Sequence, residues 1–123
     1  MVCGGIGAYK IAWVVSGLAQ EGVEVRCAMT ASAREFLTPL TLATLSGRKV
    51  HTEIFEFDEK TTPIHIHLGR DADLVLVAPA TANTLAKAAG GQADDLVTSV
   101  LSAVRAPVLV LPSMNTRMFS NPA

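Results

Sequence analysis

The sequence has few of the residues that define several large protein classes. Only two cysteines, Cys3 and Cys27, occur in 123 residues, too few for a disulfide framework and without the Cys-x-x-Cys spacing of a redox pair. We therefore expect two small buried residues on neighbouring strands. Ten basic residues balance eleven acidic ones, for a formal net charge of −1. Without a basic cluster, nucleic acid is not an expected partner.

Long apolar runs are also absent, so no segment is expected to span a bilayer. The first residues do not resemble a secretory signal, because Gly4 and Gly5 interrupt the apolar stretch and no positively charged region precedes them. We therefore expect a cytoplasmic protein. Half of the residues are apolar, which is enough for one core but not for two, so residues 1–123 are expected to form a single domain.

Short apolar runs alternate with helical patterns along the chain. Strands are expected at residues 1–3, 23–29, 74–78 and 108–111, and helices at 8–20, 39–46, 83–89 and 96–104. Ser32 could cap a further short helix that contains Phe36, while residues 48–64 give no clear pattern. Such alternation predicts an α/β fold with a doubly wound, open parallel sheet, which is Rossmann-like (flavodoxin-like) and has three layers.

Two polar segments directly follow apolar runs, Pro79–Thr84 after the run at 74–78 and Pro112–Met118 after the run at 108–111. Runs so short and uniformly apolar are typical of strands buried on both faces. Both segments would then leave the carboxyl ends of parallel strands, where open α/β sheets bind ligands. The alternative is a plain strand-to-helix turn with Thr81 or Asn83 as the helix N-cap.

The turn Gly5-x-Gly7 between a strand and a helix invites comparison with dinucleotide-binding loops. The third glycine of that motif is replaced by Lys10, and no acid that could hold a ribose stands at the end of the second strand. Thr30 and Ser32 stand there instead, and hydroxyls at a helix start suit a phosphate. The turn therefore favours a mononucleotide over NAD, although two glycines can also mark nothing more than a tight turn.

His65 and His67 are expected on one side of an extended segment, or close together in a turn, before the strand at 74–78. Two histidines at this spacing could begin a metal site, but no third ligand of suitable type and spacing stands out, so no metal is expected. A histidine near a strand entry is often a structural residue.

The chain gives the pattern of a domain cut at both ends. Its first expected strand has about three residues where five or six are usual. At the other end, Pro122 and Ala123 directly follow the second polar segment, without a closing helix. A fragment of a larger domain is therefore expected.

Taken together, these segments resemble the flavoprotein family of FMN-dependent cysteine decarboxylases, and above all its members that act on phosphopantothenoylcysteine. The resemblance runs from Gly4 to Ala123. It is carried by the glycine turn with Ala8-Tyr9-Lys10, Thr30-x-Ser32-Ala33, His65-Ile66-x-Leu68 with Ala72-Asp73-Leu74, the PASANT-type segment Pro79–Thr84 and the P-x-M-N-x-x-M segment Pro112–Met118. Two such motifs in this order form a specific signal, which the glycine turn alone would not.

The resemblance implies an FMN-dependent decarboxylase that converts phosphopantothenoylcysteine, a small-molecule substrate, to phosphopantetheine in coenzyme A biosynthesis. His65 would be the catalytic base, and Asn115 would hold the substrate amide or carboxylate. His67 stands where relatives commonly carry an acidic or polar residue. Family members form trimers or multiples of trimers, with the flavin between subunits. The positions that match flavin contacts are Gly5, Thr30, Ser32, Phe36, Pro79, Ala80, Thr81, Ala82 and Asn83.

Two alternatives stay open within this resemblance. One is decarboxylation of a C-terminal cysteine on a peptide, and the other is a flavin-binding regulatory subunit without turnover. The family's substrate clamp, with its cysteine, and the ligase domain found in many bacterial relatives have no counterpart in residues 1–123. The clamp would distinguish the two substrates, because it frames the group attached to the cysteine.

Overall fold

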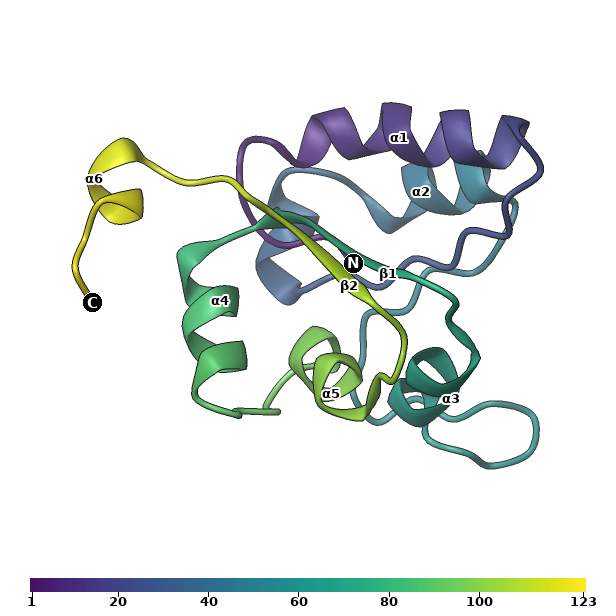
Figure 1. Ribbon diagram of the computed structural model, residues 1–123. Coiled ribbons are helices and arrows are strands. Elements are labelled where there is room, and N and C mark those ends of the chain that lie inside the picture. The colour runs from purple at the N-terminus through teal and green to yellow at the C-terminus, as the bar shows by residue number, and fades with distance from the viewer.

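A parallel sheet runs through the middle of the molecule in the computed structural model, which describes residues 1–123 (Figure 1). Its two regular strands are β1 (Val75–Ala80) and β2 (Val108–Pro112). They pair in parallel from Val75 beside Val108 to Ala80 beside Pro112, with a register shift between Val77 and Ala80. Both strands therefore run past their expected ends at residues 78 and 111, and they include Pro79, which lies in the register shift, and Pro112.

The segment Met1–Cys3 lies beside β1 and forms the middle of the sheet. Its amino group donates a hydrogen bond to the Leu76 carbonyl at 2.6 Å, and its first carbonyl accepts one from the Ala78 amide at 2.9 Å. On its other side, Val2 forms a parallel bridge with Met29. The segment is therefore held by backbone pairing on both edges.

The sheet ends at the segment around His51, which forms a parallel bridge with Ala28. Across the sheet, the strands follow the order third, second, first, fourth, fifth of the sequence. The order reverses between Met1–Cys3 and β1, and open parallel sheets bind ligands at such a reversal. This arrangement confirms the expected α/β, Rossmann-like class of fold.

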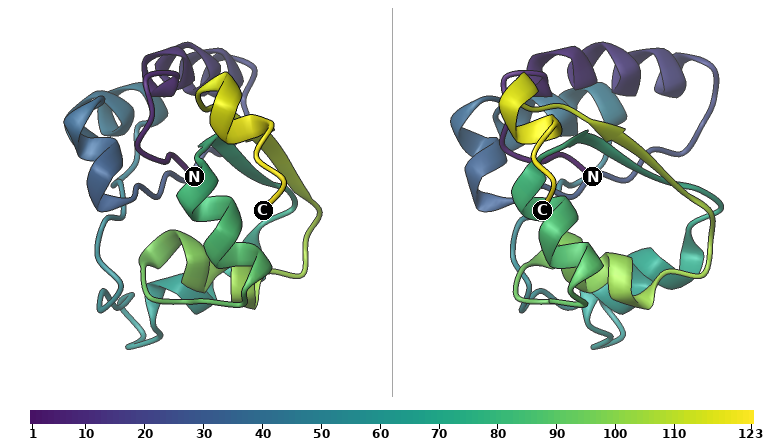
Figure 2. Two further views of the ribbon diagram at one scale, coloured as in Figure 1. Left: turned by 90° about the vertical axis from the view of Figure 1, so that its left-hand side faces the viewer. Right: turned by 60° about the vertical axis from the view of Figure 1, so that its left-hand side comes forward.

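Helices cover both faces of the sheet and complete three layers (Figure 2). On one face pack α1 (Ala8–Gln20) and α2 (Pro39–Ser46). The opposite face is covered by three helices: α3 (Ile64–Asp71), α4 (Ala82–Ala89) and α5 (Leu96–Ala103). Two short helices follow strand ends: the 3₁₀ helix η1 (Ala31–Glu35) and α6 (Thr116–Phe119).

Local sequence explains where most helices begin and end. α1 buries Ile11 and Val15, four residues apart, against the sheet. In α2, the Thr38 hydroxyl accepts from the Thr41 amide, Pro39 occupies the first turn, and Gly47 ends the helix with φ +68°. The expected helical ranges 8–20 and 39–46 are both confirmed.

The core lies on both faces of the central strands. Both cysteines are buried and free, as expected, and burial raises the pKa of the Cys3 and Cys27 thiols. The larger cluster, between the sheet and α1 with α2, contains Val2, Ala8, Ile11, Val15, Cys27, Met29, Ala33, Leu42, Val50 and Ala78.

The longest helix, α1 with 13 residues, is too short for a membrane span, and no other helix has the length and apolar character for one.

Three expectations about local structure are wrong. His65 and His67 lie in a helix, α3, because Ile64 and Leu68 bury one helical face at a spacing of four. The second strand pairs only at Ala28–Met29 and not over residues 23–29. β2 is exposed along all five residues, since it is the outermost strand of the sheet.

Candidate functional site

Four loops meet at the carboxyl end of the sheet. They follow the first, second, fourth and fifth strands and are centred on Gly4–Gly7, Thr30–Ser32, Pro79–Thr81 and Pro112–Ser113. The last two are joined directly, because the Ser113 amide donates to the Ala80 carbonyl at 3.0 Å. In Figure 1, β1 and β2 end at the same side of the sheet, where they lead into α4 and α6. The two polar segments therefore leave the same edge, as the sequence predicted.

The glycine turn faces the other three loops. A Cβ atom on Gly5 would lie 3.6 Å from the Thr81 methyl and 3.9 Å from both the Pro79 ring and the Ser113 carbonyl. On Gly7 it would lie 3.1 Å from the Ser113 hydroxyl. The absence of a side chain at Gly5 thus leaves a hollow between three loops, open to a ligand that approaches the backbone.

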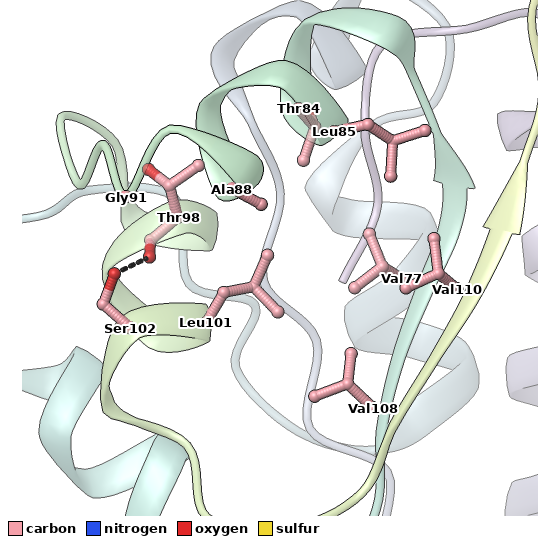
Figure 3. Close-up of a pocket in the computed structure, with 10 residues that line it drawn as sticks. All are labelled: Val77, Thr84, Leu85, Ala88, Gly91, Thr98, Leu101, Ser102, Val108 and Val110. Atoms are coloured by element: carbon pink, nitrogen blue, oxygen red, sulfur yellow. Dashed lines mark hydrogen bonds between the residues drawn. The ribbon is translucent and has the colours of Figure 1, made fainter.

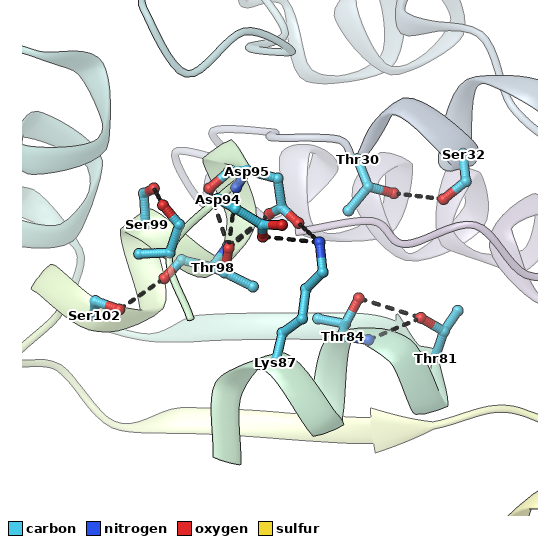
Figure 4. Close-up of polar contacts among 11 residues, drawn as sticks. Thr30, Ser32, Thr81, Thr84, Lys87, Asp94, Asp95, Thr98, Ser99 and Ser102 are labelled. Atoms are coloured by element: carbon cyan, nitrogen blue, oxygen red, sulfur yellow. Dashed lines mark hydrogen bonds and ion pairs between the residues drawn. The ribbon is translucent and has the colours of Figure 1, made fainter. Parts of the chain in front are cut away.

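Gly4 brings the first and second loops into contact. A Cβ atom there would overlap the Ser32 side chain and lie 2.7 Å from its carbonyl carbon. Beside this contact, the hydroxyls of Thr30 and Ser32 lie 3.2 Å apart, as Figure 4 shows. Thr30, and not Ser32 as expected, caps η1, by accepting from the Ala33 amide.

Several amide groups at this edge have no acceptor within the chain. They belong to Gly4, Ile6, Gly7, Ala31 and Ser32. Amides that point out of a turn before a helix form a ready site for an anion, and the two hydroxylated side chains add further donors. The first two loops therefore fit a phosphate group.

The third loop holds Thr81 at the start of α4. Its hydroxyl accepts from the Thr84 amide at 3.3 Å and lies 3.2 Å from the Thr84 hydroxyl (Figure 4), so Thr81 is the N-cap. Asn83 is exposed in the first turn of the helix, with its carboxamide free. The loop thus offers carbonyl and amide groups for the edge of a heterocycle. It also forms an ordinary capped helix start.

The fourth loop carries Asn115 to the start of α6. The Asn115 side-chain carbonyl accepts from the Arg117 amide at 2.9 Å, which leaves its NH₂ group free to donate. Figure 1 shows α6 extending away from the body of the molecule. Ser113 is a site residue that sequence reasoning missed, although its place directly after the strand end at Pro112 was the available signal.

The base expected from the family, His65, lies in a different part of the molecule. It lines a pocket of about 610 Å³ on the helical layer formed by α3 and α5, together with Phe55, Phe57 and Ser99. No residue of the four strand-end loops lines this pocket. One copy of the chain therefore brings the four strand-end loops together but does not bring His65 to them.

His67 is engaged in an ion network. Arg26 approaches its Nε2 atom at 2.7 Å, and because arginine can only donate, Nε2 is the acceptor. Asp58 lies 3.2 Å from Nδ1 without hydrogen-bond alignment, and Asp71 lies 3.4 Å from Nε2. The Thr62 amide chiefly lowers the pKa of the Asp58 carboxyl, and the nearby imidazole adds to this. His67 thus connects α3 to two neighbouring segments.

A second network fixes the far end of α4. Lys87 pairs with Asp94 at 2.8 Å and with Asp95 at 3.1 Å, and Asp95 caps α5 by accepting from the Thr98 amide (Figure 4). Burial raises the pKa of the Asp95 carboxyl, but the bonds from Thr98 and Lys87 outweigh it and hold that pKa below the usual range. The network holds the helix that presents Thr81 to the hollow.

An apolar pocket of about 510 Å³ lies between the sheet and the helices α4 and α5 (Figure 3). Its walls include Val77, Leu85, Leu101 and Val110, and its polar groups are hydroxyls, with Ser102 donating to the Thr98 carbonyl. Because no charged or titratable side chain lines it, this pocket has no group for acid–base chemistry. The strand-end hollow is the candidate site.

Comparisons with known proteins find a matching family model and similar proteins. The family model described as Flavoprotein matches residues 1–123. The coenzyme A biosynthesis bifunctional protein CoaBC of Mycobacterium tuberculosis is 49% identical over 122 residues, which cover 99% of the chain and 29% of that protein. The CoaBC protein of Bacillus subtilis is 44% identical, with 99% and 30% covered. The chain thus spans about a third of the length of the curated relatives that it matches.

Solved structures give the same result. The FMN-dependent cysteine decarboxylase SpaF matches with a TM-score of 0.89 and 37% identity, over 98% of this chain and 70% of that one. A PPC decarboxylase mutant complexed with pantothenoylaminoethenethiol matches with a TM-score of 0.81 and 33% identity, over 98% and 68%.

Proposed function

The chain belongs to the Flavoprotein family, and on that premise we propose that it binds FMN and decarboxylates phosphopantothenoylcysteine to phosphopantetheine in coenzyme A biosynthesis. The observation that carries this proposal is the hollow at Gly5, bordered by Pro79, Thr81 and Ser113. It lies where open parallel sheets bind ligands, and the family motifs form its walls. Because that substrate is a phosphorylated metabolite, we also propose that the protein works in the cytoplasm.

The residues of the hollow fit FMN. The free amides of the glycine turn and of Ser32, with the hydroxyls of Thr30 and Ser32, would hold the phosphate. Pro79–Asn83 would border the flavin ring, with Phe36, half exposed at the end of η1, beside the site. When bound, FMN supplies the two-electron oxidation of the substrate thiol that lets carbon dioxide leave, and returns the electrons afterwards.

Two side chains of this protein would act on the substrate. His65 is the proposed base, and because its Nδ1 atom is buried, Nε2 is the nitrogen that would take the proton. The free NH₂ group of Asn115 would donate to the substrate amide or carboxylate. His67 is bound within its ion network, which supports His65 as the acting histidine.

We further propose that the active site forms between copies of the chain, in a trimer or a multiple of it. His65 opens into a pocket away from the strand-end hollow, so a second copy would have to bring the two together. Apolar side chains surround His65 at the surface, with Phe55 86% and Phe57 57% exposed. Such a patch is typical of a surface that another molecule covers.

We also propose that residues 1–123 are one FMN-binding domain. All the helices that flank the sheet pack on one continuous set of strands. β2 exposes Leu109 and Leu111 to solvent at 53% and 44%, and an apolar outer strand of this kind is expected to be covered by another element. Further chain and a second copy are the two sources of such an element.

Cofactor identity and turnover test the proposed function. The whole protein, saturated separately with FMN, FAD and NAD and then denatured, is expected to release only FMN, identified by mass. With FMN bound, it should convert phosphopantothenoylcysteine to phosphopantetheine at a higher kcat/KM than a peptide that ends in cysteine. Release of FAD or NAD, or no turnover of either substrate, would reject the proposal. A preference for the peptide would favour the alternative in which the enzyme decarboxylates the C-terminal cysteine of a peptide.

Complementation between inactive variants tests the shared site. His65→Asn removes the base that one copy contributes to a shared site, and Gly5→Val impairs the FMN-binding hollow that the other copy contributes. Each variant alone is therefore expected to be inactive. Mixed by joint refolding or co-expression, they should regain activity, because some sites then combine an intact His65 with an intact glycine turn. Native mass spectrometry shows whether mixed trimers form. Mixed trimers that have no activity would contradict the proposal, and so would a fully active monomer with flavin bound.

A further inference from the structure

Ser113 carries a hydroxyl at the strand-end hollow that no other group of the chain binds. The residue directly follows β2 and is half-buried. Its backbone is held in place, because its amide donates to the Ala80 carbonyl at 3.0 Å. Its hydroxyl takes part in no hydrogen bond within the chain, whereas the Thr81 hydroxyl caps α4. Ser113 is therefore a firmly placed residue whose hydroxyl is free both to donate and to accept.

The glycine turn makes room for this hydroxyl at Gly7. Gly7 has φ −65° and ψ −9°, a right-handed conformation open to L-residues, so its backbone does not require glycine. A Cβ atom there would lie 3.1 Å from the Ser113 hydroxyl oxygen, closer than ordinary van der Waals contact. Its other neighbours, the Cβ atoms of Pro79 and Ser113, would lie at 3.6 and 3.7 Å, which are ordinary contacts. The missing side chain at Gly7 therefore leaves space for one group, the Ser113 hydroxyl.

Ser113 lies between the two parts of the hollow. On one side is the glycine turn, where the free amides of Ile6 and Gly7 would hold a phosphate. On the other side is the third loop, because Pro79 approaches the same Gly7 position and the Ala80 carbonyl accepts from the Ser113 amide. That loop would border the flavin ring. A hydroxyl between these two places suits the part of FMN that links its phosphate to its ring, which is the ribityl chain.

We propose that the Ser113 hydroxyl is a further cofactor-binding group, which forms a hydrogen bond with a hydroxyl of the ribityl chain of FMN. This inference rests on the proposed function, in which FMN occupies the hollow. The hydroxyls of the ribityl chain both donate and accept, as a serine hydroxyl does. Gly7 is then a positioning residue, because a side chain there would displace the Ser113 hydroxyl. Neither residue takes part in the chemical step, so both act through cofactor affinity.

The affinity for two flavins tests this contact without turnover. Ser113→Ala is expected to raise the Kd of the whole protein about three- to tenfold, the usual effect of losing one neutral hydrogen bond. FMN and riboflavin should lose affinity by the same factor, because both carry the ribityl chain. In the matched control, Ser120→Ala, the lost hydroxyl donates to the Thr116 carbonyl within α6, so Kd should change by less than about twofold. Fluorescence quenching of each flavin gives Kd.

A double-mutant cycle tests the role of Gly7. Gly7→Ala is expected to raise the Kd for FMN about threefold or more, because the new Cβ atom moves the Ser113 hydroxyl away from the ribityl chain. In the Ser113→Ala background the same change should have almost no effect, since the oxygen that it displaces is gone. Gly17→Ala, in α1 with nothing within 4 Å of its Cβ position, controls for the replacement of glycine. Thermal melts show that each variant folds.

The alternatives give different results. An unchanged Kd for both flavins in Ser113→Ala would overturn the proposed contact, while FMN binding by the wild type would leave the proposed function intact. A loss of affinity for FMN alone would place the contact at the phosphate, and shifted absorption maxima of bound FMN would place it at the ring. Either result would overturn the ribityl contact. Additive effects of Gly7→Ala and Ser113→Ala would overturn the role of Gly7. A wild-type protein that binds no flavin would overturn the proposed function as well.

Discussion

Replacement of His65 by asparagine is expected to lower the rate of decarboxylation at least about 100-fold, as is usual when a general base is removed. FMN binding should stay intact, because His65 lines a pocket that contains no residue of the strand-end loops. Asparagine keeps a polar side chain of similar size but cannot take a proton at neutral pH. The measurements are kcat with phosphopantothenoylcysteine and the absorbance of bound flavin.

His67→Asn is the matched control, two residues away in the same helix. Its imidazole accepts from Arg26 and lies near two carboxylates, and partly exposed pairs of this kind contribute about 1 kcal/mol or less. We expect a small loss of stability and a change in rate of less than about fivefold. Equal losses of rate from the two variants, or a larger loss from His67→Asn, would contradict the assignment of His65 as the base.

Gly5→Val is expected to weaken flavin binding strongly while the protein still folds. A Cβ atom on Gly5 meets Thr81 at 3.6 Å, an ordinary contact, so the fold can accept it. The methyl groups of valine would then occupy the hollow beside Pro79 and Ser113. Overpacking costs about 1–3 kcal/mol, so the Kd for FMN should rise up to about 150-fold. Fluorescence quenching of FMN gives Kd, and a thermal melt reports the fold.

Gly17→Val controls for the substitution itself. Gly17 lies inside α1 with nothing within 4 Å of its Cβ position, so valine there should change FMN affinity by less than about twofold. Since glycine is the poorer helix former, the protein should be no less stable. FMN binding of Gly5→Val within about threefold of the wild type would show that the cofactor lies elsewhere.

Regular helices with local signals could be predicted to the residue. For α1 and α2, buried residues four apart, the cap at Thr38 and the glycine at Gly47 are all contained in a short stretch of sequence. α3 has such a pair too, Ile64 and Leu68, but its low overall apolar content hid the pattern. A local signal thus sufficed only where enough residues repeated it.

Strand burial was less predictable, because it depends on neighbours that are distant in the chain. The apolar residues of β2 read as a strand buried on both faces, yet the sheet places them at its edge. The same limit applies to the site. Motifs located the loops at Pro79 and Pro112, but only the folded chain shows Ser113 beside Gly7 and His65 in a separate pocket.

The pairing of Met1–Cys3 has a consequence for how the protein is made. This segment forms the middle of the sheet, yet its hydrogen-bond partner on one side, Leu76, is 75 residues further along the chain. On the ribosome, the central strand must therefore wait, with Val2 and Cys3 exposed, until β1 has emerged from the tunnel. Translation at roughly 5–20 residues per second makes this delay several seconds, during which holdase chaperones have an apolar segment to bind.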